Sequence, residues 1–191
     1  MVWCEIIRQK IQNQAKVLYS LGIATGGNLL MKYVDEIECP DITNREGHSA
    51  KVYFNALRGS SFSRSDDCFF NSALNYGYGV LLSCMTREIV ANGYLTQLGL
   101  FHHNVFNEFN LGSDLMEPFR PLMDSIVLKL EEKEELTHED KIQILSFLDY
   151  KVVINNQTQS IKNAISIYVK SVFEAIENCD ISAIRFYRYG F

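Results

Sequence analysis

Two adjacent histidines and an acidic pair occur in one short stretch, GLFHHNVFNEFNLGSDLMEPFRP, which covers residues 99–121. Asp114 and Glu117 are three residues apart, so a helix would carry both on one face. Pro118 lacks an N–H group and fits best among the first residues of a helix, which predicts a helix start near Ser113 or Asp114. A simpler alternative is that the two acids only stabilise that helix start, where the helix dipole favours negative charge.

A further carboxylate, Glu46, occurs in NREGHSAKVYF at the expected head of another helix. One histidine, His102 or His103, together with two or three carboxylates is a ligand set for Mg²⁺ or Mn²⁺. Zinc fits less well, because the sequence has no C-x-x-C pair and no H-E-x-x-H motif. A divalent ion held in this way can polarise a phosphoryl group and lower the pKa of an attacking hydroxyl. If the three segments meet in space, the residues indicate phosphodiester chemistry.

Charge is unevenly distributed along the 191 residues, whose formal net charge is −5. Residues 124–149 contain eight acids and three lysines, whereas residues 45–64 contain four basic residues and one acid. A polyanion could bind the basic segment, with Arg45 and Arg58 in contact with DNA, while EEKEELTHED, residues 131–140, stays in solvent. Charge alone leaves open the alternative that these are scattered solubilising charges.

The elements that must position these residues are expected to be helices, since apolar residues recur at helical spacing and only three prolines interrupt the chain. One small β hairpin is expected around Asn155 and Asn156. The sequence predicts an all-α fold, a single compact domain over residues 1–191. Its helices are expected near residues 2–21, 27–37, 48–59, 66–91, 136–148 and 161–176, besides the one that starts near residue 113.

Composition excludes several classes of protein. Hydrophobic residues at 47% and charged residues at 21% are globular values. No apolar run approaches the ~18 residues that span a bilayer, and the charges within residues 1–21 are unlike a signal peptide. The five cysteines are odd in number and scattered. We therefore expect reduced, mostly buried thiols in a cytoplasmic protein without membrane contact.

Three motifs together resemble the CRISPR-associated spacer-acquisition integrases, the Cas1 family. They are NREGHSAKVYFNALRG, then FSR with NSALNYGYGVLL, then TQLGLFHHNVFNEFNLGSDLMEPFRPLMD. The stretch WCEIIRQKIQNQAKVL also resembles the opening of that family's helical domain. The EPFRP motif and the F-N-x-F-N run are most similar to sequences of the type II branch, whose members are found beside the RNA-guided effector Cas9. The resemblance implies the C-terminal helical catalytic domain, without the β-rich N-terminal domain usual in the family.

The resemblance also implies roles for individual residues. Glu46 in R-E-G, His102 three residues after Gly99, and Glu117 in D-L-M-E match the ligands of a Mg²⁺ or Mn²⁺ ion. Asp114 matches a nearby catalytic acid that is a secondary ligand or orients the others. The positions that line the active site and the DNA path are Arg64, Asn75, Tyr76 and Arg120.

For several of these residues and their neighbours, a purely structural role remains an alternative to a role in catalysis or DNA binding. Asn71 and Asn75 are spaced to bond one another or a neighbouring helix, and Tyr76 and Tyr78 are suited to a core. His103 is expected beside the site, in contact with DNA or with nothing. His48 and His138 are expected outside it.

The implied reaction is transesterification, in which the 3′-hydroxyl of a short captured DNA attacks a phosphodiester at the edge of a CRISPR repeat. The same site would cleave branched DNA when water or another hydroxyl attacks. Family members act on double-stranded DNA as homodimers bridged by the small protein Cas2, and type II members also engage Cas9 and other adaptation proteins. One alternative is a catalytically inert helical fragment that binds DNA or a partner. Another is a helical phosphohydrolase, but the adjacent His-Asp pair that it usually needs is absent.

Overall fold

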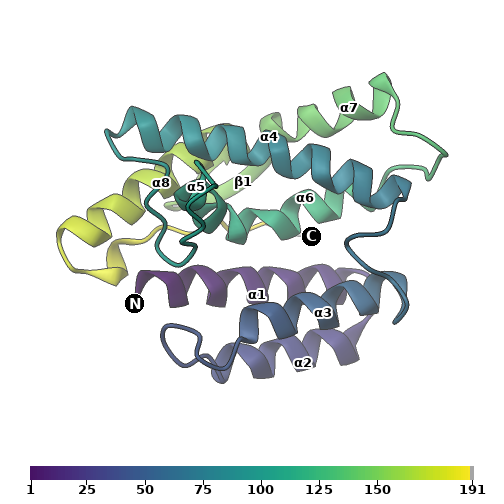
Figure 1. The fold of residues 1–191 in the computed structure, drawn as a ribbon, viewed down its shortest axis with the longest axis horizontal. Coiled ribbons are helices and arrows are strands. Elements are labelled where there is room, and N and C mark those ends of the chain that lie inside the picture. The colour runs from purple at the N-terminus through teal and green to yellow at the C-terminus, as the bar shows by residue number, and fades with distance from the viewer. Residues whose placement is uncertain (190–191) are drawn as a thin grey trace.

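The computed structural model describes residues 1–189 and has an all-α fold with one two-stranded sheet (Figure 1). The α-helices are α1 (Val2–Ser20), α2 (Ala24–Asp35), α3 (Arg45–Arg58), α4 (Phe69–Ala91), α5 (Asn110–Leu115), α6 (Arg120–Val127), α7 (His138–Leu145) and α8 (Ile161–Glu177). The strands are β1 (Lys151–Ile154) and β2 (Gln157–Ser160), and short 3₁₀ turns are η1 (Glu117–Phe119), η2 (Ser146–Asp149) and η3 (Ile181–Ala183). The expected fold class is confirmed.

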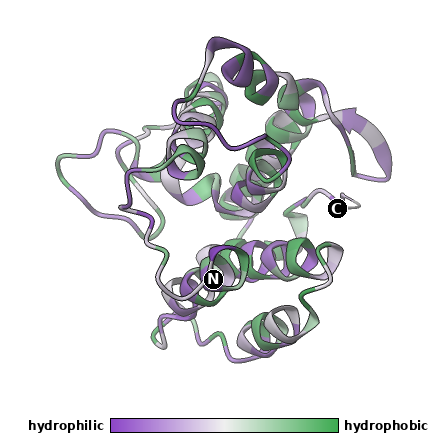
Figure 2. Ribbon diagram, turned by 90° about the vertical axis from the view of Figure 1, so that its right-hand side faces the viewer, coloured by the Kyte–Doolittle hydropathy of each residue, from purple (hydrophilic) through white to green (hydrophobic). Residues whose placement is uncertain are grey.

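Two groups of helices pack around α1. Helices α2 and α3 contact α1 and each other, while α4 contacts α5, α6, α7 and α8 on the opposite side (Figure 1). Helix α1 joins the two groups because it also contacts α6 and η1. Its apolar face, with Ile7, Ile11 and Leu18, is fully buried, as the helical spacing predicts. Figure 2 shows the three N-terminal helices on one side of the molecule and the other helices across from them.

Four helix starts differ by three residues from the expected ones. Helices α2 and α3 begin at Ala24 and Arg45, whereas starts near residues 27 and 48 were expected. Helix α4 begins at Phe69 with Cys68 as its N-cap, and Asp66 instead accepts a hydrogen bond from the N–H of Ser63 at 2.8 Å. The helix expected from residue 113 begins at Asn110 and is divided into α5, η1 and α6. Pro118 and Pro121 explain the division, since neither can donate to the carbonyl four residues earlier.

The β hairpin and one helix cap form as expected. Asn155 and Asn156 have φ angles of 52° and 58°, which suit the two-residue turn between β1 and β2. Thr137 and Asp140 form a reciprocal capping box at the start of α7. No described helix is long and apolar enough to cross a membrane.

The expectation of five reduced cysteines is wrong for one pair. Cys4 near the start of α1 and Cys39 after α2 form a disulfide with their Cα atoms 5.8 Å apart. Cys68, Cys84 and Cys179 are free, and of these only Cys84 is buried. The pairing depends on the packing of α1 against α2, which a separation of 35 residues in the sequence does not reveal.

Candidate active site

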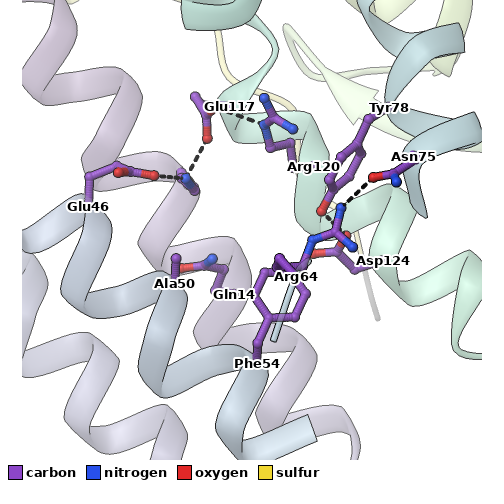
Figure 3. Close-up of a pocket in the computed structure, with 11 residues that line it drawn as sticks. Gln14, Glu46, Ala50, Phe54, Arg64, Asn75, Tyr78, Glu117, Arg120 and Asp124 are labelled. Atoms are coloured by element: carbon purple, nitrogen blue, oxygen red, sulfur yellow. Dashed lines mark hydrogen bonds and ion pairs between the residues drawn. The ribbon is translucent and has the colours of Figure 1, made fainter. Parts of the chain in front are cut away.

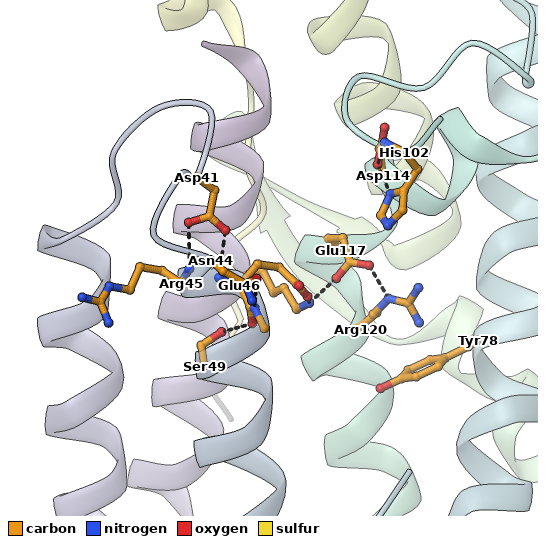
Figure 4. A network of polar contacts seen from close by, with 12 residues as sticks. Asp41, Asn44, Arg45, Glu46, Ser49, Tyr78, His102, Asp114, Glu117 and Arg120 are labelled. Carbon is orange, nitrogen blue, oxygen red and sulfur yellow. Dashed lines mark hydrogen bonds and ion pairs between the residues drawn. The ribbon is translucent and has the colours of Figure 1, made fainter. Parts of the chain in front are cut away.

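Glu46 is positioned by the loop that precedes α3. The Asp41 carboxylate accepts hydrogen bonds from the N–H groups of Arg45, at 2.8 Å, and Glu46, at 3.0 Å (Figure 4). Asn44, with a φ of 51°, caps the helix by accepting from the N–H of Gly47 at 3.3 Å. These bonds fix the first turn of α3, so that the Glu46 side chain lies beside α1.

Glu117 is positioned by η1, which is anchored from two sides. The carbonyl oxygen of Pro118 accepts hydrogen bonds from the Asn13 amide on α1 and from the Tyr187 hydroxyl near the C-terminus, both at 2.9 Å. Arg120 follows on α6, and its Nε donates to Glu117 Oε1 at 2.8 Å. The Glu117 side chain is therefore buried with its carboxylate directed at neighbouring cations.

Lys10 of α1, which the sequence analysis did not select, lies between the two acids. Its ammonium group forms ion pairs with Glu46 Oε1 and, at 2.5 Å, with Glu117 Oε2. Figures 3 and 4 show the side chains of Glu46 and Glu117 on either side of this position. Burial by itself would lower the pKa of Lys10, but the Glu117 and Glu46 carboxylates raise it above its ordinary value. Burial would likewise raise the pKa of Glu117, but Arg120 and Lys10 hold it below its ordinary value. Lys10 and Glu117 are thus both charged at neutral pH.

Asp114 orients the histidine rather than joining the two glutamates. Its side chain is fully buried, and its Oδ2 accepts the N–H groups of Leu100, at 2.6 Å, and Phe101, at 2.9 Å. Its Oδ1 contacts Nδ1 of His102, and this hydrogen bond is the main reason that the pKa of His102 is raised. With Nδ1 bound in this way, Nε2 of His102 is the nitrogen left for a ligand.

Two further contacts hold the loop that carries His102. The Phe101 ring stacks on the ring of Trp3 from α1, with ring centres 4.7 Å apart. A Cβ atom at Gly99 would come within 2.4 Å of the His102 carbonyl oxygen, so this close backbone approach requires glycine. The glycine that precedes His102 by three residues therefore has a steric role in the loop.

A cavity of about 350 Å³ opens beside Lys10 and is bounded by α1, α3, α4, α6 and the loop before α4 (Figure 3). The Arg64 guanidinium donates to the Asn75 amide oxygen at 2.8 Å, and the Arg120 guanidinium lies 4.5 Å from the centre of the Tyr78 ring. The cavity is lined by Lys10, Gln14, Glu46, Ala50, Phe54, Arg64, Asn75, Tyr78, Glu117, Arg120 and Asp124. Two arginines and the paired acids thus face one space.

A buried carboxyl group lies at the far side of this cavity. Tyr78 donates a hydrogen bond to Asp124 Oδ1 at 2.5 Å. Burial raises the pKa of Asp124 from 3.8 to about 6, although the Tyr78 hydrogen bond opposes the shift. Asp124, one of the eight acids of residues 124–149, is therefore a buried group of the cavity and not part of a solvated surface.

Arg64, Asn75 and Arg120 line the cavity, but Tyr76 does not. The contact of these residues with DNA stays a prediction. The Tyr76 ring instead lies 5.9 Å from the Lys141 ammonium of α7, and Tyr78 takes the position at the cavity. Asn71 is not bonded to Asn75 as the alternative suggested; Arg64 donates to the amide oxygens of both.

Two other expected DNA contacts, Arg45 and Arg58, are engaged away from the cavity. Arg45 forms an ion pair with Glu36 at 2.9 Å. Arg58 forms an ion pair with Glu132. The expected separation of a basic face from an acidic one is therefore wrong at Arg58, because the segment around Glu132 folds back onto the end of α3. His103 lies apart from the glutamates, in a separate depression.

The side chains do not form a ready cluster of three ligands. Among residues 1–189, no three His, Cys, Asp or Glu side chains are grouped so that they could hold a metal ion. The donors nevertheless fit a divalent cation, because Glu46 and Glu117 direct carboxylate oxygens at one cation position, where the Lys10 ammonium is the partner of the buried Glu117 Oε2. Carboxylate oxygens and an imidazole suit Mg²⁺ or Mn²⁺. The triad of Glu46, His102 and Glu117 stays a prediction.

Six residues that line the cavity were not predicted as site residues, namely Lys10, Gln14, Ala50, Phe54, Tyr78 and Asp124. A signal was present for two of them. In RQKIQNQ, Lys10 and Gln14 are four residues apart on the buried side of an amphipathic helix, and both are almost fully buried. A lysine at such a position needs a buried anionic partner.

The fold and the site define a class: a helical domain in which carboxylates from two elements face one cation position beside two arginines. The sequence model of the family described as "CRISPR associated protein Cas1" matches residues 2–160, and the chain belongs to this family. The CRISPR-associated endonuclease Cas1 of Neisseria meningitidis serogroup C (strain 8013) is 40% identical over 174 residues, which are 89% of this chain and 57% of that protein. The chain thus spans little more than half the length of this relative.

Solved structures share the fold. A casposase bound to an integration product matches with a TM-score of 0.75 and 20% identity, covering 93% of this chain and 64% of the casposase. A chain of a Cas6-RT-Cas1–Cas2 complex matches with a TM-score of 0.76 and 16% identity, covering 96% of this chain and 24% of the other. At these identities the likeness concerns the fold alone.

Proposed function

We propose that this chain is the catalytic domain of a metal-dependent DNA integrase and endonuclease of CRISPR adaptation. The observation that carries the proposal is that Glu46 and Glu117 direct their carboxylates at one cation position, at the edge of a cavity that also contains Arg64 and Arg120. When bound there, Mg²⁺ or Mn²⁺ would polarise the phosphoryl group and lower the pKa of the attacking hydroxyl. The arginines supply positive charge for a phosphodiester backbone.

Each side chain has a task in this scheme. Arg64 and Arg120 hold the non-bridging oxygens of the phosphate, and Arg120 also keeps Glu117 ionised. Asp114 holds His102 so that Nε2 is available as the third donor. The 3′-hydroxyl oxygen of the incoming DNA forms a bond to phosphorus while the P–O3′ bond of the repeat strand breaks. One phosphodiester replaces another: the attacking hydroxyl loses its proton to solvent, and the leaving 3′-oxygen of the repeat strand takes up a proton from solvent. No covalent enzyme intermediate is needed.

The proposed substrate and partners follow from the relatives. The casposase is bound to an integration product, and another structural neighbour belongs to a complex with Cas2. We infer double-stranded DNA as substrate, Cas2 as the bridging partner and a homodimer of the whole protein. The EPFRP motif supports membership in the type II branch. For a member of that branch we infer contacts to Cas9 and other adaptation proteins.

The test is cleavage and joining of a branched DNA that imitates a half-integrated fragment, with Mn²⁺ and with or without Cas2. The chain should resolve the branch only with the divalent ion, and Glu117→Gln should abolish the reaction. Glu134→Gln, in the exposed acidic segment, is the matched control and should keep full activity. DNA binding without any metal-dependent cleavage or joining would instead support the inert binding fragment.

A further inference from the structure

We propose that Lys10 is a built-in competitor for the divalent cation: its ammonium group holds Glu46 and Glu117 together in the metal-free protein, and the cation binds by displacing it. The inference rests on the proposed metal dependence of the site and extends it by assigning Lys10 the part of a positioning residue. Lys10 acts through the two glutamates and has no assigned role in the family resemblance.

The distances leave room for one cation at a time. The Lys10 Nζ atom lies 2.5 Å from Glu117 Oε2 and is also paired with Glu46 Oε1. A Mg²⁺ ion that binds the same two carboxylates needs oxygens at ~2.0–2.1 Å. The ion and the ammonium group would therefore have to occupy the same position between the two acids.

The charges explain why the metal-free protein needs the lysine. Glu46 and Glu117 contribute two negative charges, which Lys10 and Arg120 balance with two positive ones. Both Lys10 and Glu117 are only 5% exposed, so loss of the ammonium would leave Glu117 buried opposite a second carboxylate. Such an arrangement is strongly unfavourable unless another cation replaces the first.

The neighbouring cavity gives the displaced side chain a place to go. Lys10 and Gln14 on α1 both line the space of about 350 Å³. The lysine stem is flexible, so the ammonium can turn into this space while the helix stays intact. There the ammonium would face a bound phosphate together with Arg64. Binding of the divalent ion would therefore also add the positive charge of Lys10 to the cavity proposed to hold DNA.

Titration with Mn²⁺ alone, followed by isothermal calorimetry, distinguishes a competitor from a merely structural ion pair. An ammonium that occupies the position about 90% of the time weakens metal binding about tenfold, so Lys10→Met should bind Mn²⁺ about tenfold more tightly than the wild type. The variant should also unfold at a lower temperature without metal and gain more from added Mn²⁺. Lys16→Met, which changes an exposed lysine on the same helix, should match the wild type in affinity.

Weaker or unchanged Mn²⁺ binding by Lys10→Met overturns the proposal for Lys10 while leaving the metal site intact. If neither the wild type nor any variant binds Mn²⁺, the proposed metal dependence fails, and the role of Lys10 fails with it.

If Lys10→Met does not fold, acetylation of the wild-type chain provides the same test. Lys10 should be protected without Mg²⁺ and should react once Mg²⁺ saturates the site, while the exposed Lys51 reacts equally in both states. Continued protection of Lys10 at saturation overturns the proposal.

Discussion

Replacement of Asp114 by asparagine tests how His102 is oriented. Asparagine has the same size but offers one acceptor oxygen and one NH₂ donor. The Oδ2 side of Asp114 accepts two backbone N–H groups, from Leu100 and Phe101, so the amide oxygen should stay on that side. The NH₂ group then faces Nδ1 of His102, which must become an acceptor, and the ring proton moves to Nε2. The nitrogen proposed to bind the metal would be blocked.

The expected loss of stability follows from the same contacts. Hydrogen bonds to an ionised group contribute about 1.5–3 kcal/mol each, against about 0.5–1.5 kcal/mol for neutral ones. Two such bonds become neutral in Asp114→Asn, which gives a loss of about 2 kcal/mol. Asp114→Ala removes the acceptor altogether and should cost more, about 4 kcal/mol, because the two N–H groups lose their partner.

Urea unfolding measures the stability, and ¹⁵N NMR of the imidazole reports the tautomer. In Asp114→Asn the neutral His102 ring should carry its proton on Nε2, and the pKa of His102, which Asp114 raises, should fall. Mn²⁺ affinity should fall with it. His48, which lies outside the site, serves as the internal control. A His102 ring that keeps its proton on Nδ1, in a variant as stable as the wild type, would refute this account of Asp114.

Three other predictions test the histidine register, the DNA path and the buried acid. His102→Ala should abolish Mn²⁺-dependent strand transfer, whereas His103→Ala should retain most of it; equal losses in correctly folded variants would contradict the register. Arg64→Glu should weaken the binding of duplex DNA and reduce the slope of log K against log salt by about 0.9 per lost phosphate contact, as measured in anisotropy titrations. Glu135→Lys should leave DNA binding nearly unchanged. The opposite pattern would place the DNA at the acidic segment. The pKa of Asp124 is about 6 in the folded protein, against 3.8 for an ordinary aspartate, which represents the unfolded chain. As pH rises from 3.8 to about 6, Asp124 therefore loses its proton in the unfolded chain before it does so in the folded protein. The free energy of unfolding of the wild type should fall by up to about 3 kcal/mol over this range. Asp124→Asn should lack this loss when urea unfolding is compared at about pH 4 and about pH 7, and an equal loss in the variant would show that another group causes it.

The helical fold and the two glutamates were predictable because local patterns encode them. Apolar spacing sets α1, the turn residues Asn155 and Asn156 set the hairpin, and short motifs mark Glu46 and Glu117. Lys10 was missed because a lone lysine in a helix ordinarily indicates a solvated charge. Its ion pair with Glu46 joins residues 36 positions apart, which only the packing of α1 against α3 brings together.

The unexpected contacts of Tyr76 and Arg58 have the same physical origin. Tyr76 and Tyr78 are two residues apart on α4 and so point to different sides, and the positions of α6 and α7 decide which side faces the cavity. Arg58 appeared free for DNA because its partner Glu132 lies 74 residues later. Charge patterns along a sequence give composition, but the pairing of charges depends on long-range contacts.

The most direct test of the proposed site is a crystal of this chain soaked in Mn²⁺, at a concentration that calorimetry shows to be saturating, and measured for anomalous scattering. We predict one Mn²⁺ peak at ~2.0–2.2 Å from a carboxylate oxygen of Glu46, a carboxylate oxygen of Glu117 and Nε2 of His102, with the Lys10 ammonium moved into the neighbouring cavity. A Mn²⁺ peak held by other residues, with Lys10 still between the two glutamates, would contradict it.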